Sequence, residues 1–294
     1  MTHIALLAVL IACLVTGCTG MLQGSGAPAT SSAPSSESAS QGPDLTINQV
    51  TEPELAQFFT KRVEVFGLDI LATSDTPDAK ISHAAAVVAQ YLDNDQDGQA
   101  DDPAVTTSLE EQRATLLMAP DQEALELLDP FGSSALEGRL LQDLYAEETA
   151  PTGGRFDASL EEIHHLILNG GWSRVYPKQL GQQSGSEIAT YMNIARGGYF
   201  EETPQEYPVG AWFSYDDETC TYDCMLTEYT YWVHTSLLGA QATSRRCEEI
   251  LREWKLCFPD EVVETDDAAT IFQNPKNLLP DRLPDGNYQG SNPN

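Results

Sequence analysis

The pattern of apolar and polar residues predicts strands and helices in alternation along the first half of the chain. Residues 62–72 (RVEVFGLDILA) are rich in β-branched side chains, and this composition predicts a strand. After the turn-forming stretch SDTPDA, apolar residues recur three and four positions apart, which predicts a helix over 80–92. Residues 108–118 predict a helix that passes into a strand, whereas 140–145 fits either kind of element. The first half of the chain is therefore expected to contain both strands and helices.

The second half of the chain is dominated by predicted helices. An Asp-Ala-Ser sequence typical of a helix N-cap precedes residues 160–169, acidic residues fill their first turn, and Gly170 and Gly171 follow as a stop signal. The residues after 276 are rich in Pro, Gly and Asn and are expected to wrap around the surface without regular structure. Together these patterns predict a single mixed α+β domain, with further helices at 122–128, 187–195, 225–240 and 244–254.

The pattern of apolar and small residues at the N-terminus is typical of an export signal. An apolar run from Ile4 to Val15 is too short to cross a bilayer, and small residues separate it from Cys18. This pattern resembles the lipobox of bacterial lipoproteins, in which the chain is cut before a cysteine that then receives lipid. The resemblance implies a signal peptide over 1–17, a lipid anchor at Cys18 and, because Thr19 follows, the outer membrane if the source is Gram-negative. Ordinary secretion is the alternative.

A change in composition separates the N-terminus from the rest of the chain. Residues 18–43 consist largely of Ser, Ala, Gly and Pro and are expected to form a flexible linker. Apolar and aromatic residues able to fill a core are spread over 44–294, which we expect to be one globular domain.

The charge of the chain limits its partners. Forty-five acidic and fifteen basic residues give a formal net charge of −30. Such a charge disfavours binding to nucleic acid or to an anionic membrane surface, so contact with a membrane is expected only through the Cys18 lipid. Binding of cations is compatible with it, and solubility alone is the simpler explanation.

Four cysteines lie in the predicted domain. An even number of cysteines in an exported chain favours two disulfides, and three pairings are open. The rival interpretation is a metal site, but the CxxxC and Cx9C spacings do not match a zinc ribbon. The disulfide candidates are Cys220, Cys224, Cys247 and Cys257.

The sequence DNDQDGQADD, at the end of the helix predicted over 80–92, contains alternating carboxylates around Gly98. It resembles the calcium loops of EF-hands, dockerins and thrombospondin type 3 repeats. Alternate carboxylates of a tight loop project inward, and such a cage of hard oxygens selects calcium. The resemblance implies calcium ligands at Asp93, Asp95, Asp97, the Gln99 carbonyl and Asp101.

The calcium resemblance departs from the EF-hand at position twelve. Ala104 stands where an EF-hand has a bidentate glutamate, so Asp102 or a remote carboxylate would have to replace it. The alternative is a solvated acidic turn, because Asp-Gly and Asn-Asp also form ordinary turns.

The sequence EEIHH begins at Glu161 and resembles the zincin signature HExxH with glutamate in place of the first histidine. Positions i and i+4 of a helix lie on one face, so Glu161 and His165 could hold one metal ion, zinc or another divalent transition metal. The resemblance implies that Glu162 is catalytic and activates water, and that the α+β domain has a zincin-like fold. In zincins of the gluzincin type a glutamate on a later helix is the third ligand, which points to Glu228.

The same residues allow a structural interpretation. Acidic side chains stabilise the N-terminal end of a helix through its dipole, which would account for Glu161 and Glu162. His164 shares an apolar stripe with Ile163 and Ile167 and would then pack into the core.

Two functions from different classes are therefore predicted. The first is a calcium-binding surface lipoprotein that is also a divergent zincin-like metallohydrolase acting on peptides. The second is a non-catalytic surface module, stabilised by calcium, that binds a peptide or a surface polymer. The stretches HAAAVVAQYLDNDQDGQADDP, EEIHHLI and TEYTYWVHTSLLGAQ also resemble a family of uncharacterised exported bacterial proteins, a resemblance that implies no activity.

Overall fold

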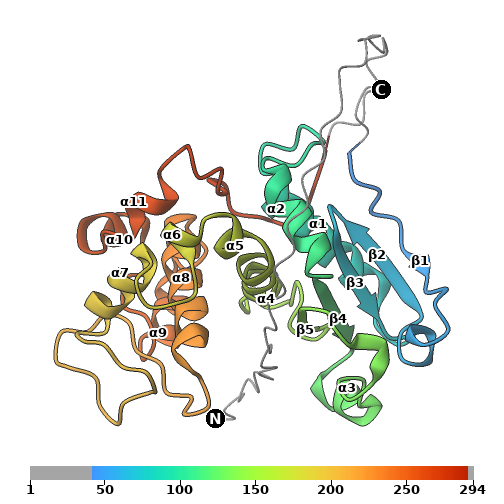
Figure 1. Ribbon diagram of the computed structural model, residues 1–294, viewed down its shortest axis with the longest axis horizontal. Coiled ribbons are helices and arrows are strands. Elements are labelled where there is room, and N and C mark those ends of the chain that lie inside the picture. Colours follow the sequence, from blue (N-terminus) through green and yellow to red (C-terminus); the bar gives the residue numbers. More distant parts are fainter. Residues whose placement is uncertain (1–41, 291–294) are drawn as a thin grey trace, which may run out of the picture. The chain divides into compact units, whose positions relative to one another are not determined.

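The computed structural model describes residues 42–290, which form a single α+β domain as predicted (Figure 1). The predicted signal peptide, Cys18 and nearly all of the predicted linker lie outside the described residues. Within 42–290, no helix has both the length and the apolar character needed to cross a bilayer.

A five-stranded mixed sheet forms one side of the domain, with its strands in sequence order. The first three strands pair antiparallel, whereas the last two pairings are parallel. Helices connect the parallel strands, as such crossovers require. The strands are β1 (Asn48–Gln49), β2 (Lys61–Val65), β3 (Leu68–Ala72), β4 (Thr115–Ala119) and β5 (Leu141–Tyr145).

The prediction of one strand over 62–72 is wrong, because the chain reverses in the middle of this segment. Phe66 and Gly67 have φ angles of 50° and 85°, the left-handed conformation of a two-residue hairpin turn. Val65 therefore pairs directly with Leu68. A side chain at position 67 would also collide with helix α2 (Pro103–Glu111), since a Cβ there would lie 2.9 Å from the Thr106 carbonyl oxygen.

The predicted helices are present, and most of them begin or end a few residues away from the predicted bounds. Two of them, α3 (Gln122–Leu128) and α7 (Glu187–Ala195), have the predicted bounds. The other predicted helices are α1 (Asp78–Leu92), α2 (Pro103–Glu111), α4 (Ser159–Ile167), α8 (Tyr222–Leu237) and α9 (Ser244–Ile250). The structure adds short helices that the pattern did not predict: η1 (Leu55–Gln57), η2 (Ser134–Leu136), α5 (Ser173–Val175), α6 (Pro177–Leu180), α10 (Pro259–Thr265) and α11 (Ala269–Phe272).

Gly170 and Gly171 do not end helix α4, contrary to the prediction. The chain continues through them as a π-helical turn, η3 (Leu168–Trp172), and then enters α5. A Cβ on Gly171 would lie 2.7 Å from Val105 Cγ1, and one on Gly170 would lie 2.9 Å from Leu109 Cδ2. The two glycines therefore allow α2 to pack closely against this turn.

Side chains on the two faces of the sheet enter different cores. Ile70 and Leu116 point into the main core, where α1 and α4 cover the sheet. Leu71 and Leu117 point to the opposite face, where they form a smaller core with Leu125 of α3. Helix α8 lies in the middle of the helical side of the domain, and α4 lies between α8 and the sheet (Figure 1).

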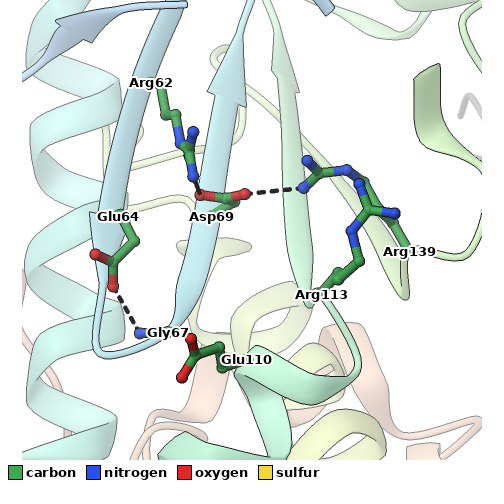
Figure 2. Close-up of a pocket in the computed structure, with 7 residues that line it drawn as sticks. All are labelled: Arg62, Glu64, Gly67, Asp69, Glu110, Arg113 and Arg139. Carbon is green, nitrogen blue, oxygen red and sulfur yellow. Dashed lines mark hydrogen bonds and ion pairs between the residues drawn. The ribbon is translucent and has the colours of Figure 1, made fainter. Parts of the chain in front are cut away.

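A partly buried ion pair network lies on the face of the sheet opposite α4. Asp69 on β3 is 9% exposed. Its carboxylate lies 2.6 Å from a nitrogen of Arg62 on β2 and 2.8 Å from NH1 of Arg139 (Figure 2). One carboxylate thus links two strands to the segment before β5.

The segment 277–290 contains no helix or strand and packs along α1, as predicted for the end of the chain. Asn94 donates a hydrogen bond to the Arg282 carbonyl oxygen at 2.9 Å, and Gln90 accepts one from the Gly286 amide at 2.8 Å. Side-chain amides of buried residues therefore satisfy the backbone of this segment.

Both predicted disulfides are present, and each joins neighbouring cysteines. Cys220 pairs with Cys224 across the start of α8, and Cys247 on α9 pairs with Cys257. The structure thereby selects one of the three open pairings.

We predict that Gly171→Ala lowers the free energy of unfolding by about 1–2 kcal/mol. The new methyl group overlaps Val105, and this overlap outweighs the ~1 kcal/mol that alanine gains in helix propensity. Urea denaturation followed by circular dichroism measures the change. Gly132→Ala is the control, because a Cβ at Gly132 meets nothing within 4 Å. A Gly171→Ala variant as stable as the wild type would mean that the π turn does not need close packing.

Candidate metal centre

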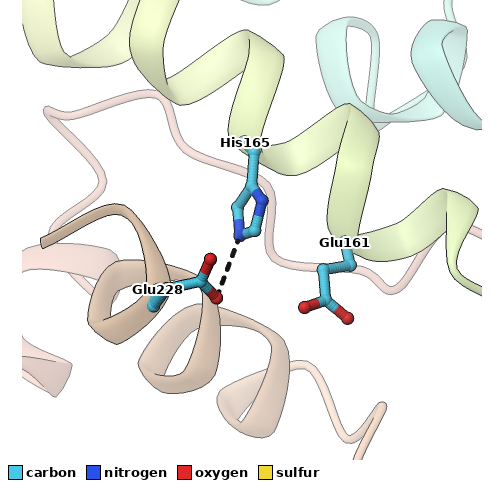
Figure 3. A group of neighbouring side chains, drawn as sticks. All are labelled: Glu161, His165 and Glu228. Carbon is cyan, nitrogen blue, oxygen red and sulfur yellow. Dashed lines mark ion pairs between the residues drawn. The ribbon is translucent and has the colours of Figure 1, made fainter. Parts of the chain in front are cut away.

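The contact between α4 and α8 brings together the three residues that were predicted as metal ligands. Glu161 and His165 lie one turn apart on α4, and Glu228 faces them from α8 (Figure 3). One potential ligand atom of each residue lies within 4.8 Å of the other two. The distance from His165 Nε2 to the nearer Glu228 oxygen is 3.6 Å. This geometry could accommodate one cation between an imidazole and two carboxylates.

The ring of His165 is buried, and one of its nitrogens is unsatisfied. The side chain is 4% exposed, and Nε2 has no hydrogen-bond partner among the described residues. A buried polar atom without a partner is unfavourable and rare in folded proteins. Nε2 faces the carboxylate of Glu228, and Glu161 completes the group of potential ligands, so a divalent cation bound by all three residues through this nitrogen would satisfy it.

Glu162 lies at the other edge of the His165 ring. Its side chain is 6% exposed and accepts a hydrogen bond of 2.6 Å from Gln142 on β5. One of its oxygens lies 3.8 Å from His165 Nδ1, whereas Glu228 approaches Nε2. A carboxylate next to the second nitrogen is the usual means of orienting a metal-binding histidine.

Two half-buried carboxylates, Glu148 and Glu253, act on Glu161 in addition to the buried Glu162 and Glu228. Burial, together with the negative charge of Glu161, raises the pKa of Glu148 to about 7 and that of Glu253 to about 7. Burial also raises the pKa of Glu228 to about 8 against the opposing effect of His165, and it raises the pKa of Glu162 well above its usual range. The centre is therefore short of positive charge.

Glu148 and Glu253 were not identified from the sequence. Glu148 follows β5 and Glu253 follows α9, so neither has a fixed spacing from the EEIHH motif. The position of Glu253 beside Trp254, which is fully buried, is the one local sign that its carboxyl lies in apolar surroundings. Only the packing of distant elements brings both carboxylates near α4.

His164 belongs to the core, as the structural interpretation predicted. Its Nε2 lies 3.1 Å from Nδ1 of His234 on α8, and His234 Nε2 donates to the Pro280 carbonyl oxygen at 2.9 Å. That carbonyl fixes the proton of His234 on Nε2, so His164 Nε2 must donate to His234. Burial lowers the pKa of His234 to about 4 and that of His164 well below its usual range. This neutral pair connects α4, α8 and the C-terminal segment.

The acidic loop after α1 also brings carboxylates together. Potential ligand oxygens of Asp93, Asp95 and Asp101 lie within 4.8 Å of one another, and Asp97 does not join this group. Asp97 Oδ1 instead accepts a hydrogen bond from the Gln99 amide at 2.8 Å. The structure therefore assembles three of the four carboxylates predicted for calcium.

Asp102 does not take the place of the missing twelfth ligand. Its Oδ1 accepts a hydrogen bond from the Ala104 amide at 2.9 Å and so caps α2. Its Oδ2 accepts another from the Tyr176 hydroxyl at 2.6 Å. One residue from far along the chain that does contact a predicted ligand is Tyr288, whose hydroxyl donates to Asp93.

Comparisons with known proteins give no relative that could assign a function. No protein-family model matches the chain. Neither the curated proteins nor the solved structures include a match. The site must therefore be interpreted from its own geometry.

We predict that Glu228→Gln reduces the dependence of stability on pH in metal-free protein. Between pH 4.5 and about 8, Glu228 is protonated in the folded chain and ionised in the unfolded chain. Because the unfolded chain then binds fewer protons, the free energy of unfolding decreases as pH rises, by at most about 1.4 kcal/mol per pH unit for this carboxyl. Glutamine removes that contribution. Urea denaturation with a chelator at pH 5, 6, 7 and 8 tests it, and parallel pH profiles of the two proteins would contradict it.

Proposed function

We propose that the protein binds one divalent transition metal ion through Glu161, His165 and Glu228. The observation that carries this proposal is the buried, unpartnered Nε2 of His165, which lies 3.6 Å from a Glu228 oxygen in a group of potential ligands that Glu161 completes. Repulsion among the buried carboxylates supports it as well, because a bound cation would offset that repulsion.

The ligand set favours zinc or a harder ion such as manganese. One imidazole and two carboxylates are known ligands of both ions, and glutamate in place of a second histidine makes the ion a weaker Lewis acid. A divalent cation in such a site supplies electrophilic polarisation and activates water, which is the chemistry of metallohydrolases. We propose peptides as the substrate class on the basis of the resemblance to zincins.

A specific observation favours the alternative of a non-catalytic binding module. Glu162, which was predicted to activate water, lies at the Nδ1 edge of His165 and accepts a hydrogen bond from Gln142. A catalytic base would have to reach the side of the ring where Glu161 and Glu228 gather. The position of Glu162 supports an orienting role, which either function would use.

We further propose that calcium binds the loop of Asp93, Asp95, Asp97, the Gln99 carbonyl and Asp101. The convergence of three of these carboxylates supports the proposal, as does the hydrogen bond from the Gly98 amide to Asp93 Oδ2 at 2.9 Å. Oxygen ligands in a flexible loop select calcium over transition metals. Its role would be to stabilise the loop.

An exported location, with a lipid on Cys18, is part of this proposal. Two disulfides favour an oxidising compartment outside the cytoplasm. If the source is Gram-negative, the anchor would lie in the outer membrane. The net charge of −30 argues against nucleic acid as a partner.

Elemental analysis of the purified protein after dialysis tests both metal sites. We expect close to one equivalent of zinc or manganese, lost in His165→Ala and in Glu228→Gln but retained in Asp95→Ala. Calcium should be lost in Asp95→Ala but retained in His165→Ala and in Glu228→Gln. Activity against a peptide library is then measured on the loaded protein. Absence of any transition metal from the wild type after reloading would refute the proposal, and full loading without peptidase activity would favour the binding module.

Glu162→Gln distinguishes an orienting residue from a catalytic base. If Glu162 orients His165, the substitution should weaken zinc affinity by about 10–100-fold. A base that does not orient the ligand would leave the affinity unchanged and abolish only hydrolysis. Competition with a chromophoric chelator measures the affinity. Glu148→Gln is the matched control, since it removes a nearby half-buried carboxylate that makes no ion pair with His165 within 4 Å.

A further inference from the structure

A second candidate site lies on the face of the sheet opposite α4. A pocket of about 440 Å³ opens at the β2–β3 hairpin, beside the end of α2 and the segment before β5. Its volume falls within the range of roughly 300–1,000 Å³ that is usual for small-molecule sites. The residues that line it are Arg62, Glu64, Gly67, Asp69, Glu110, Arg113 and Arg139 (Figure 2).

One guanidinium in this pocket lacks a full set of partners. The Arg139 side chain is 8% exposed, and its NH1 donates to Asp69 and to Thr115 Oγ1. Its Nε has no hydrogen-bond partner in the part of the chain that the structure describes. Asp69 also pairs with Arg62, whose second partner is Glu52, so two carboxylates offset the charges of these two arginines. What remains on the buried side of the pocket is one donor, the Nε of Arg139, that lacks an acceptor, and an anion bound beside this guanidinium would be attracted to it.

Arg113 adds a second positive charge on the same side. Figure 2 shows the side chains of Arg113 and Arg139 together at one edge of the pocket. Arg113 NH1 donates to the Glu137 carbonyl oxygen at 3.1 Å, and within residues 42–290 no carboxylate forms an ion pair with Arg113. Two adjacent guanidiniums form a natural receptor for one carboxylate or another oxyanion.

The opposite side of the pocket carries carboxylates. Glu64 Oε1 accepts a hydrogen bond from the Gly67 amide at 2.7 Å, which holds its carboxylate at the hairpin. Glu110 projects from the end of α2 beside Gly67, and among the described residues it forms no ion pair with an arginine or lysine. Opposite charges thus face each other across a space that no side chain of the described residues fills.

We propose that this pocket binds a small zwitterion, such as a free amino acid or a dipeptide. The carboxylate of the ligand lies between Arg113 and Arg139, and its ammonium group lies between Glu64 and Glu110. A simple anion would leave both glutamates without a cation, and a simple amine would leave Arg113 without a carboxylate. The proposal does not depend on the metal centre, which lies beyond the opposite face of the sheet.

Calorimetric titration of the purified protein tests the proposal. The probes are the twenty amino acids and glycylglycine, with acetate and methylammonium as single-charge controls. We expect at least one zwitterion to bind, and Arg113→Gln and Glu110→Gln each to weaken it about tenfold or more, since each removes a charge-assisted hydrogen bond. Glu111→Gln, an exposed neighbour on α2 that does not line the pocket, should bind like the wild type.

Two results would overturn the assignment. One is that no amino acid or dipeptide in the panel binds at millimolar concentration. The other is that acetate binds as tightly as the best zwitterion and Glu110→Gln has no effect, which would make the pocket a plain anion site. Arg113 and Glu110 are exposed, so their substitution should leave the fold intact, and circular dichroism of both variants verifies this.

Discussion

The packing of α4 against α8 confines several carboxylates in a space from which water is largely excluded, and the helical side of the domain depends on how their charge is offset. Glu162 and Glu228 are both buried, and the charge of Glu161 acts on each of them. Such a group can exist in a folded protein if some of its members are protonated, or if a cation lies among them. The contact between α4 and α8 completes the core, and it also brings together negative charges that a cation would offset. His165 lies among these carboxylates, and its Nε2 has no hydrogen-bond partner among the described residues.

Adjacent histidines on α4 contribute to different parts of the domain. Successive residues of a helix point about 100° apart, so His164 and His165 face different surroundings. His164 enters the aromatic core beside Trp172 and reaches His234, while His165 faces the carboxylates. The neutral histidine pair fixes the rotation of α4 relative to α8, and this rotation in turn sets the positions of Glu161 and His165 opposite Glu228. Core packing and the arrangement of the candidate ligands are thus determined by one helix contact.

Local patterns predicted those features that depend on local interactions. Helical periodicity was sufficient for α3 and α7, and i,i+4 spacing identified Glu161 and His165 as neighbours. The hairpin at Phe66 was missed because phenylalanine is not a typical residue of a left-handed turn. The β-branched residues on either side of it therefore predicted one continuous strand. Glycine pairs have two uses, as helix ends and as sites of close packing, and only the position of α2 decides between them. The direction of Glu162 and the approach of Glu253 likewise depend on tertiary contacts that no local spacing encodes.

The attachment of the C-terminal segment to α1 has a consequence for the order of assembly. Asn94 and Arg282 are joined by a hydrogen bond although 188 positions separate them. Contacts between residues so distant in sequence form slowly, because the intervening chain must first become ordered. During synthesis Asn94 leaves the ribosome long before its partners exist, and its amide remains hydrated until the helical side of the domain has been made. The acidic loop that contains Asn94 is therefore synthesised early but reaches its final geometry late, after nearly the whole domain has folded.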